Sequence, residues 1–95
     1  MGKAQERILV LLKGSEIKYQ KLRDGDGSMS LAYFENNFDL LAATELPNIG
    51  HYSYYYQNKE NPDLVMYFNI CSTGLTATLM LYKDAQQRIE DSKAT

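Results

Sequence analysis

Residues 24–27 (Asp-Gly-Asp-Gly) are the stretch of this chain whose oxygen-bearing side chains could bind a divalent cation. Calcium-binding loops need oxygen ligands at positions 1, 3, 5 and 12 and a glycine at position 6. Numbering from Asp24 puts Met29 at position 6, whereas placing Gly27 at position 6 puts Leu22 at position 1. Neither numbering satisfies the pattern, so the sequence predicts a tight turn here and no bound metal.

His51 and Cys71 are the single histidine and the single cysteine of the chain. A zinc site would need two further ligands at a suitable spacing, and the sequence contains no such pattern. A free cysteine after an apolar stretch is usually a buried packing residue rather than a nucleophile. The glycine-rich phosphate loops and nucleophile motifs of common enzyme families are also missing from the sequence. We therefore expect a non-enzymatic protein with no catalytic residues and no cofactor.

Tyrosine is concentrated in one predicted strand and its neighbour. It offers a large, rigid contact area with a polar tip and is enriched at protein interfaces. Stacking on single-stranded bases usually requires cations along the same groove, but residues 24–82 contain one basic side chain, Lys59. Packing inside the sheet is the alternative use of these rings. We expect a protein-binding surface made of Tyr52, Tyr54, Tyr55, Tyr56 and Tyr67.

Positive charge gathers at the N-terminal end, although the net charge of the chain is −2. Residues 1–23 carry six cationic and two anionic side chains, whereas residues 24–95 carry four and ten. Such asymmetry favours self-association or a partner of mixed charge. A nucleic acid is the alternative partner, and its phosphates would be contacted by Lys13, Lys18, Lys21 and Arg23.

The elements that must position these residues begin with two predicted helices. In residues 4–13, Ile8, Leu11 and Leu12 fall on one stripe, and a glycine stands where the helix would end. Residues 37–46 are rich in helix-forming leucine and alanine and are followed by Pro47, so they predict a central helix. We expect both helices to present an apolar side to the core.

The segment 16–34 allows two interpretations. Polar and apolar residues alternate on both sides of the Asp-Gly-Asp-Gly turn, which predicts a β-hairpin. The same residues could instead form a helix over 15–23 and a second helix over 30–46, with Ser28 or Ser30 as its cap. The sequence leaves both interpretations open.

From His51 onward the composition is typical of strands. Residues 51–57 and 64–71 flank a polar turn and predict an antiparallel hairpin. Residues 75–82 alternate in a way that favours a third strand, although a helical spacing also fits them. A capping pattern at Asp84 then predicts a short helix to about Asp91.

The fold class that follows is α+β: an N-terminal helix, a central helix at about 37–46, a three-stranded meander over about 51–82 and a short C-terminal helix. The alternative is a winged helix, in which the hairpin 52–70 is the wing. Residues 70–76 (Ile-Cys-Ser-Thr-Gly-Leu-Thr) resemble the passage after the wing in many bacterial winged-helix regulators. That resemblance implies DNA binding, yet the helix in the recognition position would carry acidic residues and no lysine or arginine.

Residues 1–95 read as a single domain. No apolar run reaches the roughly 18–20 residues that span a bilayer. One unpaired cysteine is typical of a reducing compartment, so we expect a cytoplasmic protein with no membrane partner. The predicted function is binding of a protein partner, including a second copy of the chain as a homodimer. The alternative is a winged-helix transcriptional regulator.

Overall fold

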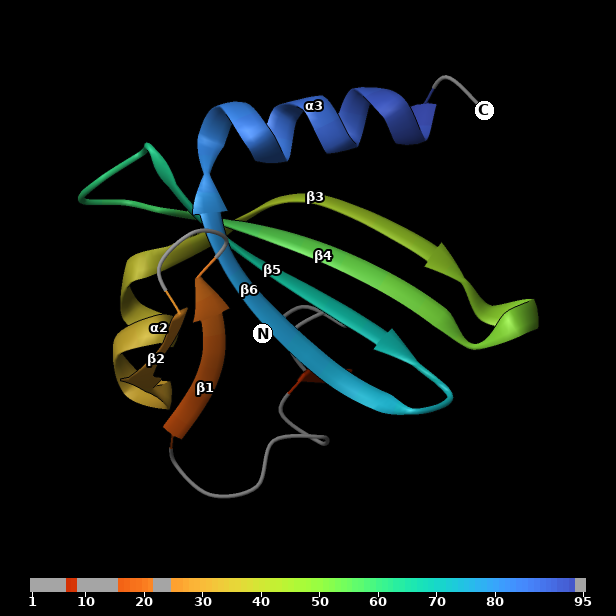
Figure 1. The fold of residues 1–95 in the computed structure, drawn as a ribbon, viewed down its shortest axis with the longest axis horizontal. Helices are drawn as coiled ribbons and strands as arrows, with labels where there is room; N and C mark the ends of the chain where they lie inside the picture. Colours follow the sequence, from red (N-terminus) through yellow and green to blue (C-terminus); the bar gives the residue numbers. More distant parts are fainter. Residues whose placement is uncertain (1–6, 9–15, 22–24, 94–95) are drawn as a thin grey trace.

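The computed structural model describes residues 7–8, 16–21 and 25–93. Among these residues, six strands form one twisted sheet in the order β2-β1-β6-β5-β4-β3 (Figure 1). The strands are β1 (Glu16–Lys21), β2 (Gly25–Ser30), β3 (Phe38–Leu46), β4 (His51–Asn58), β5 (Leu64–Cys71) and β6 (Gly74–Leu81). β2 and β3 are therefore the two outer strands of the described sheet.

The sheet is mixed because two antiparallel units meet side by side. β1 and β2 form a hairpin, and β3 to β6 form an antiparallel meander in chain order. The units join where β1 runs parallel to β6, with Gln20 opposite Thr78 and Lys21 opposite Leu79. The β3–β4 turn passes through the short 3-10 helix η1 (Pro47–Ile49), and Gly50 ends it with a positive φ of 64° that favours glycine.

Helices cover parts of both faces of the sheet. α2 (Leu31–Asn37) leads from β2 to β3, and the Ser30 hydroxyl caps it by accepting a hydrogen bond from the Tyr33 backbone at 3.1 Å. α3 (Tyr82–Lys93) follows β6 directly. No helix in the described part of the chain is long and apolar enough to span a membrane.

The face of the sheet that α2 covers, called here the α2 face, holds the larger core. Phe34 of α2 is 5.3 Å from Phe38, 5.0 Å from Tyr56 and 5.3 Å from Phe68, measured between ring centroids. Ile8 and Ile17 are fully buried in the same cluster. One helical phenylalanine thus joins the first residue of β3 to the next two strands of the sheet, β4 and β5.

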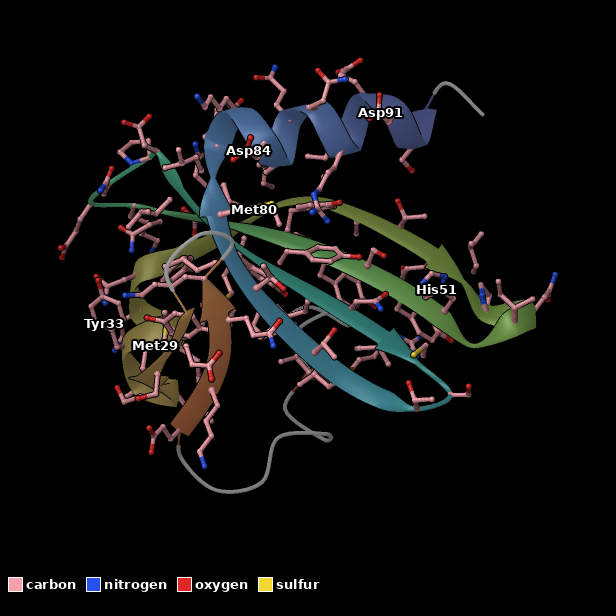
Figure 2. All side chains as sticks on the ribbon, viewed as in Figure 1. Met29, Tyr33, His51, Met80, Asp84 and Asp91 are labelled. Carbon is pink, nitrogen blue, oxygen red and sulfur yellow. The ribbon has the colours of Figure 1, made fainter. Side chains whose placement is uncertain are left out.

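The opposite face, called here the α3 face, holds a smaller core. Ala85 of α3 is fully buried there against Tyr55, Val65 and Met80, and Ile89 packs on the edge of the cluster. Figure 2 shows Met80 and Asp84 together at the start of α3, with His51 at the other end of the sheet. α3 therefore leaves part of this face uncovered near η1.

The predicted α+β arrangement is wrong, because most of the described chain is strand rather than helix. Residues 37–46, expected to form a central helix, are the strand β3 apart from Asn37, the last residue of α2. β3 pairs with β4 along its length, from Phe38 opposite Asn58 to Leu46 opposite His51. Pairing with a long, tyrosine-rich strand has overridden the helix propensity of leucine and alanine.

The winged-helix alternative is wrong for the same reason. Residues 15–23 would be a helix in that fold, but residues 16–21 are β1, and the helix expected over 30–46 ends at Asn37. An N-terminal helix is not among the elements that the structure describes. Its predicted range, 4–13, lies outside the described residues apart from Arg7 and Ile8.

One open alternative is decided, and three other predictions are confirmed. The hairpin interpretation of 16–34 is correct for β1 and β2, which pair from Glu16 opposite Ser30 to Lys21 opposite Gly25. The hairpin over 51–57 and 64–71 forms β4 and β5, and the third strand forms β6. The C-terminal helix exists and begins two residues earlier than expected, at Tyr82.

Candidate functional site

The five tyrosines predicted to bind a partner are mostly part of the core. Tyr54, Tyr55 and Tyr56 are buried, and Tyr52 and Tyr67 are half-buried. As alternation predicts, successive rings of β4 point to opposite faces of the sheet. The burial of these rings leaves little of their surface for a partner.

On the α2 face, the tyrosines of β4 are tied to β3 and to the N-terminal region. The Tyr54 hydroxyl donates a hydrogen bond to Glu45 Oε2 at 2.8 Å, and the Arg7 guanidinium Nε lies 3.3 Å from the same oxygen. The Arg7 guanidinium also lies over the Tyr52 ring, 4.2 Å from its centroid. Burial, and then the adjacent Glu45 carboxylate, raise the pKa of Tyr54 well above its usual value.

On the α3 face, Tyr55 and Tyr67 pack together with ring centroids 4.7 Å apart. The Tyr67 and Ser53 hydroxyl oxygens are 3.3 Å apart, and the Arg88 guanidinium lies 5.9 Å from the Tyr67 centroid. Burial raises the pKa of the Tyr55 phenol, and the neighbouring Tyr67 adds to the effect. These contacts hold together the hairpin of β4 and β5, called here the tyrosine hairpin, on which β3 and α3 pack.

His51 and Cys71 do not form a nucleophile–base pair. His51 Nε2 is hydrogen-bonded to Asn69 Oδ1 at 2.8 Å, whereas the Cys71 sulfur is 2.9 Å from the Thr73 hydroxyl. Hydrogen bonds from the Thr73 side chain and backbone lower the pKa of the Cys71 thiol. Among the described residues, no group of three or more His, Cys, Asp or Glu side chains could hold a metal ion.

Of the four predicted nucleic-acid contacts, the structure describes two, and these two do not share a face of the sheet. Lys18 and Lys21 are both on β1, but their positions differ by an odd number of residues and so fall on opposite faces of the strand. Lys13 and Arg23 lie outside the described residues. The described residues therefore provide no groove shared by Lys18 and Lys21.

The most distinctive surface is instead the outer edge of β3. Three of the large apolar side chains that the structure exposes lie on β3 or on the turn that follows it: Leu40 at 50%, Leu46 at 46% and Ile49 at 69%. β3 has a neighbour, β4, on one side and none of the described strands on the other. Its outward N–H and C=O groups can form hydrogen bonds with the backbone of a strand from another chain.

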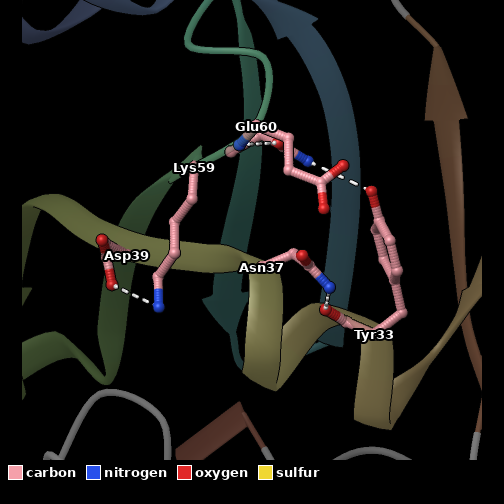
Figure 3. A network of polar contacts seen from close by, with 6 residues as sticks. Tyr33, Asn37, Asp39, Lys59 and Glu60 are labelled. Carbon is pink, nitrogen blue, oxygen red and sulfur yellow. Dashed lines mark hydrogen bonds and ion pairs between the residues drawn. The ribbon is translucent and has the colours of Figure 1, made fainter.

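The two acidic residues of β3 are each paired within the chain. Glu45 is held by Arg7 and Tyr54, as described above, and Asp39 Oδ1 lies 3.6 Å from Lys59 Nζ (Figure 3). Lys59 is fixed at this point because its backbone N–H donates to the Asn37 carbonyl at 2.8 Å. A partner along β3 would therefore meet apolar side chains and compensated carboxylates.

A cavity of about 380 Å³ lies on the α3 face beside this edge. Ala42, Ala43, Thr44 and Leu46 of β3 form one side of it, and Ile89 of α3 contributes another. The remaining lining comes from β4 and the end of α3: His51, Ser53, Tyr55 and Ser92. The cavity places space for an apolar side chain directly next to the outer strand.

The opposite edge, β2, differs from β3 in composition, although a cavity of about 530 Å³ lies beside it too, lined in part by Asp26, Gly27 and Ser28. Its sequence is Gly-Asp-Gly-Ser-Met-Ser, which is polar and poor in strand-forming residues. Tyr19 of β1 stands opposite Gly27, and a Cβ on that glycine would come within 2.7 Å of the Tyr19 ring. The chain then enters α2 directly after Ser30. β2 is therefore a short and polar edge strand, whereas β3 is long and mostly apolar.

Sequence reasoning missed Leu40, Leu46 and Ile49 because residues 37–46 were assigned to a helix. One signal could have found them. Pro47 and Gly50 mark a turn just before a strong strand, and a turn of that kind commonly joins two antiparallel strands. The alternation of apolar residues along β3 is disturbed by a register shift between Leu40 and Ala42, which hid the strand pattern.

Neither a protein-family model, nor a curated protein, nor a solved structure matches this chain.

Proposed function

We propose that this chain is a small, non-enzymatic protein-binding domain that takes its partner along the outer edge of β3. The observation that carries the proposal is the outer side of a nine-residue strand, which pairs with none of the described strands and is flanked by the exposed Leu40, Leu46 and Ile49. A strand added to such an edge gains backbone hydrogen bonds, and neighbouring pockets select its side chains. The tyrosine hairpin supports this role by holding β3 in place.

Charge also favours a protein partner over a nucleic acid at this edge. β3 contains no lysine or arginine, and its two carboxylates are compensated within the chain. Nucleic-acid affinity rests on phosphate neutralisation by cations, which this edge cannot supply. A cytoplasmic location, in keeping with the free Cys71, remains part of the proposal.

A displayed library of random linear peptides tests the proposal directly. We expect the chain, held at low concentration, to select peptides with alternating apolar residues. Leu46→Glu should abolish their binding, because it puts a charge where the peptide would pack. Ser28→Glu is the matched control, because it adds the same side chain to the other edge, opposite Lys18. Peptides that bind both variants equally well would contradict the proposal.

A further inference from the structure

We propose that the partner on β3 is a second copy of this chain, joined by antiparallel β3–β3 pairing about a two-fold axis through Thr44. This inference rests on the proposed function and specifies the occupant of the same edge. It would extend the sheet continuously across two copies, an arrangement in which both contribute the same surface.

The β-bulge in β3 selects the register. Pairing with β4 is continuous from Ala42, opposite Tyr55, to Leu46, opposite His51, but it shifts between Leu40 and Ala42. The regular outer edge is therefore the five-residue segment 42–46. In an antiparallel pair related by a two-fold axis, all five positions find partners only when the axis passes through the middle residue, Thr44.

Charge supports the same register. An axis through Thr44 places Glu45 opposite Ala43 of the second copy, so that no two carboxylates face each other. An axis through Ala42 would place Asp39 opposite Glu45 of the second copy, and like charges directly opposite are destabilising. The register that uses the whole regular edge is thus also one that avoids acid–acid contact.

Shape complementarity points to a second copy rather than to an unrelated strand. With the axis at Thr44, Leu46 lies opposite Ala42 of the second copy, and both positions belong to the α3 face. Leu46 is a large, half-exposed side chain, whereas Ala42 is small and lines the cavity of about 380 Å³. The two-fold axis repeats this contact, so each copy supplies one leucine and receives one.

The carboxylates of β3 give a further reason. An edge with unpaired acids would favour a basic partner, but Glu45 and Asp39 already have cationic neighbours, Arg7 and Lys59. An apolar edge whose carboxylates are already paired with cations is best matched by a strand that is also apolar and carries no unpaired charge. β3 of a second copy has this composition.

The first test measures mass by light scattering and sedimentation over a range of chain concentrations. We expect the mass to rise from that of the monomer to twice that value in the micromolar range, since a short edge makes a small interface. Leu46→Glu should weaken the dimer by roughly tenfold or more, because each copy must then desolvate a charge. Ser28→Glu should leave the dimer unchanged.

The second test locates the axis with single cysteines in a Cys71→Ser background under a mild thiol–disulfide buffer. Thr44→Cys faces its own copy on the axis, within the Cα separation that a disulfide allows. Ala43→Cys is displaced from its own copy by two positions, roughly 7 Å along the strand. We expect Thr44→Cys to form a covalent dimer at least about tenfold more than Ala43→Cys does.

The outcomes separate this inference from the proposed function. A chain that stays monomeric at every concentration and forms no Thr44 disulfide overturns the inference, and the function stands if displayed peptides still bind β3. A dimer that withstands Leu46→Glu and forms no Thr44 disulfide also overturns it, because the contact would then lie elsewhere. Failure of peptide binding together with a monomeric chain overturns both.

Discussion

The two edge strands of the sheet, β2 and β3, differ in length, composition and exposed apolar surface, although both lack a strand of the described sheet on their outer side. β2 is a six-residue strand of glycine, serine, aspartate and one methionine; the Tyr19 ring packs over its Gly27, and α2 follows it directly. β3 is a nine-residue strand rich in leucine and alanine, and it leaves Leu40 and Leu46 half-exposed. Natural sheets usually protect their edges with charge, proline or covering segments. β3 also carries charges and a β-bulge, but it keeps two leucines half-exposed, whereas β2 is short and polar, and for this reason we propose β3 as the binding edge.

Both edges depend on the same internal support. α2 connects β2 to β3, and Phe34 packs on Phe38, Tyr56 and Phe68. The β3 side also has a polar clasp where the β4–β5 turn meets the end of α2 (Figure 3). In this clasp, Asn58 Oδ1 accepts hydrogen bonds from the backbone N–H groups of Glu60 and Asn61 at 2.8 and 2.9 Å. Among the described strands, β3 thus has no neighbour on its outer side, while β4 and α2 hold its inner side.

The largest expected effect comes from removing the support that the two edges share. Phe34→Ala deletes a ring that is 1% exposed, and we expect a loss of about 3–5 kcal/mol in the free energy of unfolding. Leu40→Ala, on the exposed outside of β3, should change it by less than about 0.5 kcal/mol. Urea unfolding measured at a concentration where the chain is monomeric compares them. Similar losses of unfolding free energy for the two variants would contradict the view that Phe34 packs in the core while Leu40 contributes little to stability.

The clasp should have the next largest effect. Asn58 is 5% exposed, and Asn58→Ala leaves two turn N–H groups without their acceptor. We expect a loss of about 1–3 kcal/mol in the free energy of unfolding. Thermal or urea unfolding measures it, with Asn61→Ala as the control because Asn61 Oδ1 accepts a single bond, at 3.3 Å, from Asp63 N–H. A larger loss for Asn61→Ala would place the critical turn contact elsewhere.

Alkaline pH tests the strand that holds β3. Burial raises the pKa of Tyr56, which lies opposite Leu40, to about 12 from its ordinary value of 10.0. Between these two pH values the unfolded chain loses the phenol proton while the folded chain keeps it. The free energy of unfolding should therefore fall as pH rises through this window, and below it this effect should vanish.

Tyr56→Phe should reduce that alkaline loss, because phenylalanine has no proton to release. Urea unfolding of the parent chain and the variant at neutral pH and across the alkaline window measures the difference. A variant that loses stability as steeply as the parent would show that Tyr56 is not kept protonated by its burial in β4.

The smallest expected effect concerns the β2 edge of the sheet. Tyr19→Ala uncovers Gly27 and removes one cross-strand contact between β1 and β2. We expect a loss of about 0.2–1 kcal/mol in the free energy of unfolding, with faster amide exchange confined to β2. Faster exchange along β3 in this variant would show that the two edges are coupled, and would contradict our expectation that β2 and β3 behave independently.

The sequence predicted the part of the fold in which local pattern and tertiary role agree. Tyrosines and β-branched residues flank polar turns in β4 to β6, so periodicity and turn chemistry both indicated strands there. For residues 16–34 the alternation allowed a hairpin or two helices, and the pairing of β1 with β2 decides for the hairpin. β3 was missed because its leucines and alanines favour a helix when taken alone. Its strand conformation depends on pairing with β4, which a local pattern cannot show.

The candidate site was predicted less well for a related reason. Tyrosine is favoured both at interfaces and in sheet cores, so residue type alone could not decide between them. The contacts of Tyr54 with Glu45 and of Tyr55 with Tyr67 place these rings inside the molecule. The edge that they support became recognisable only when the order of the strands was known.

Amide hydrogen exchange, followed residue by residue at low and high chain concentration, tests the difference between the edges most directly. We expect the N–H groups of residues 42–46 that point away from β4 to exchange rapidly in dilute solution and to become protected as the chain concentration rises. Those of β2 should exchange at the same rate throughout. Unchanged exchange along β3, or protection gained at β2 instead, would contradict the assignment of β3 as the binding edge.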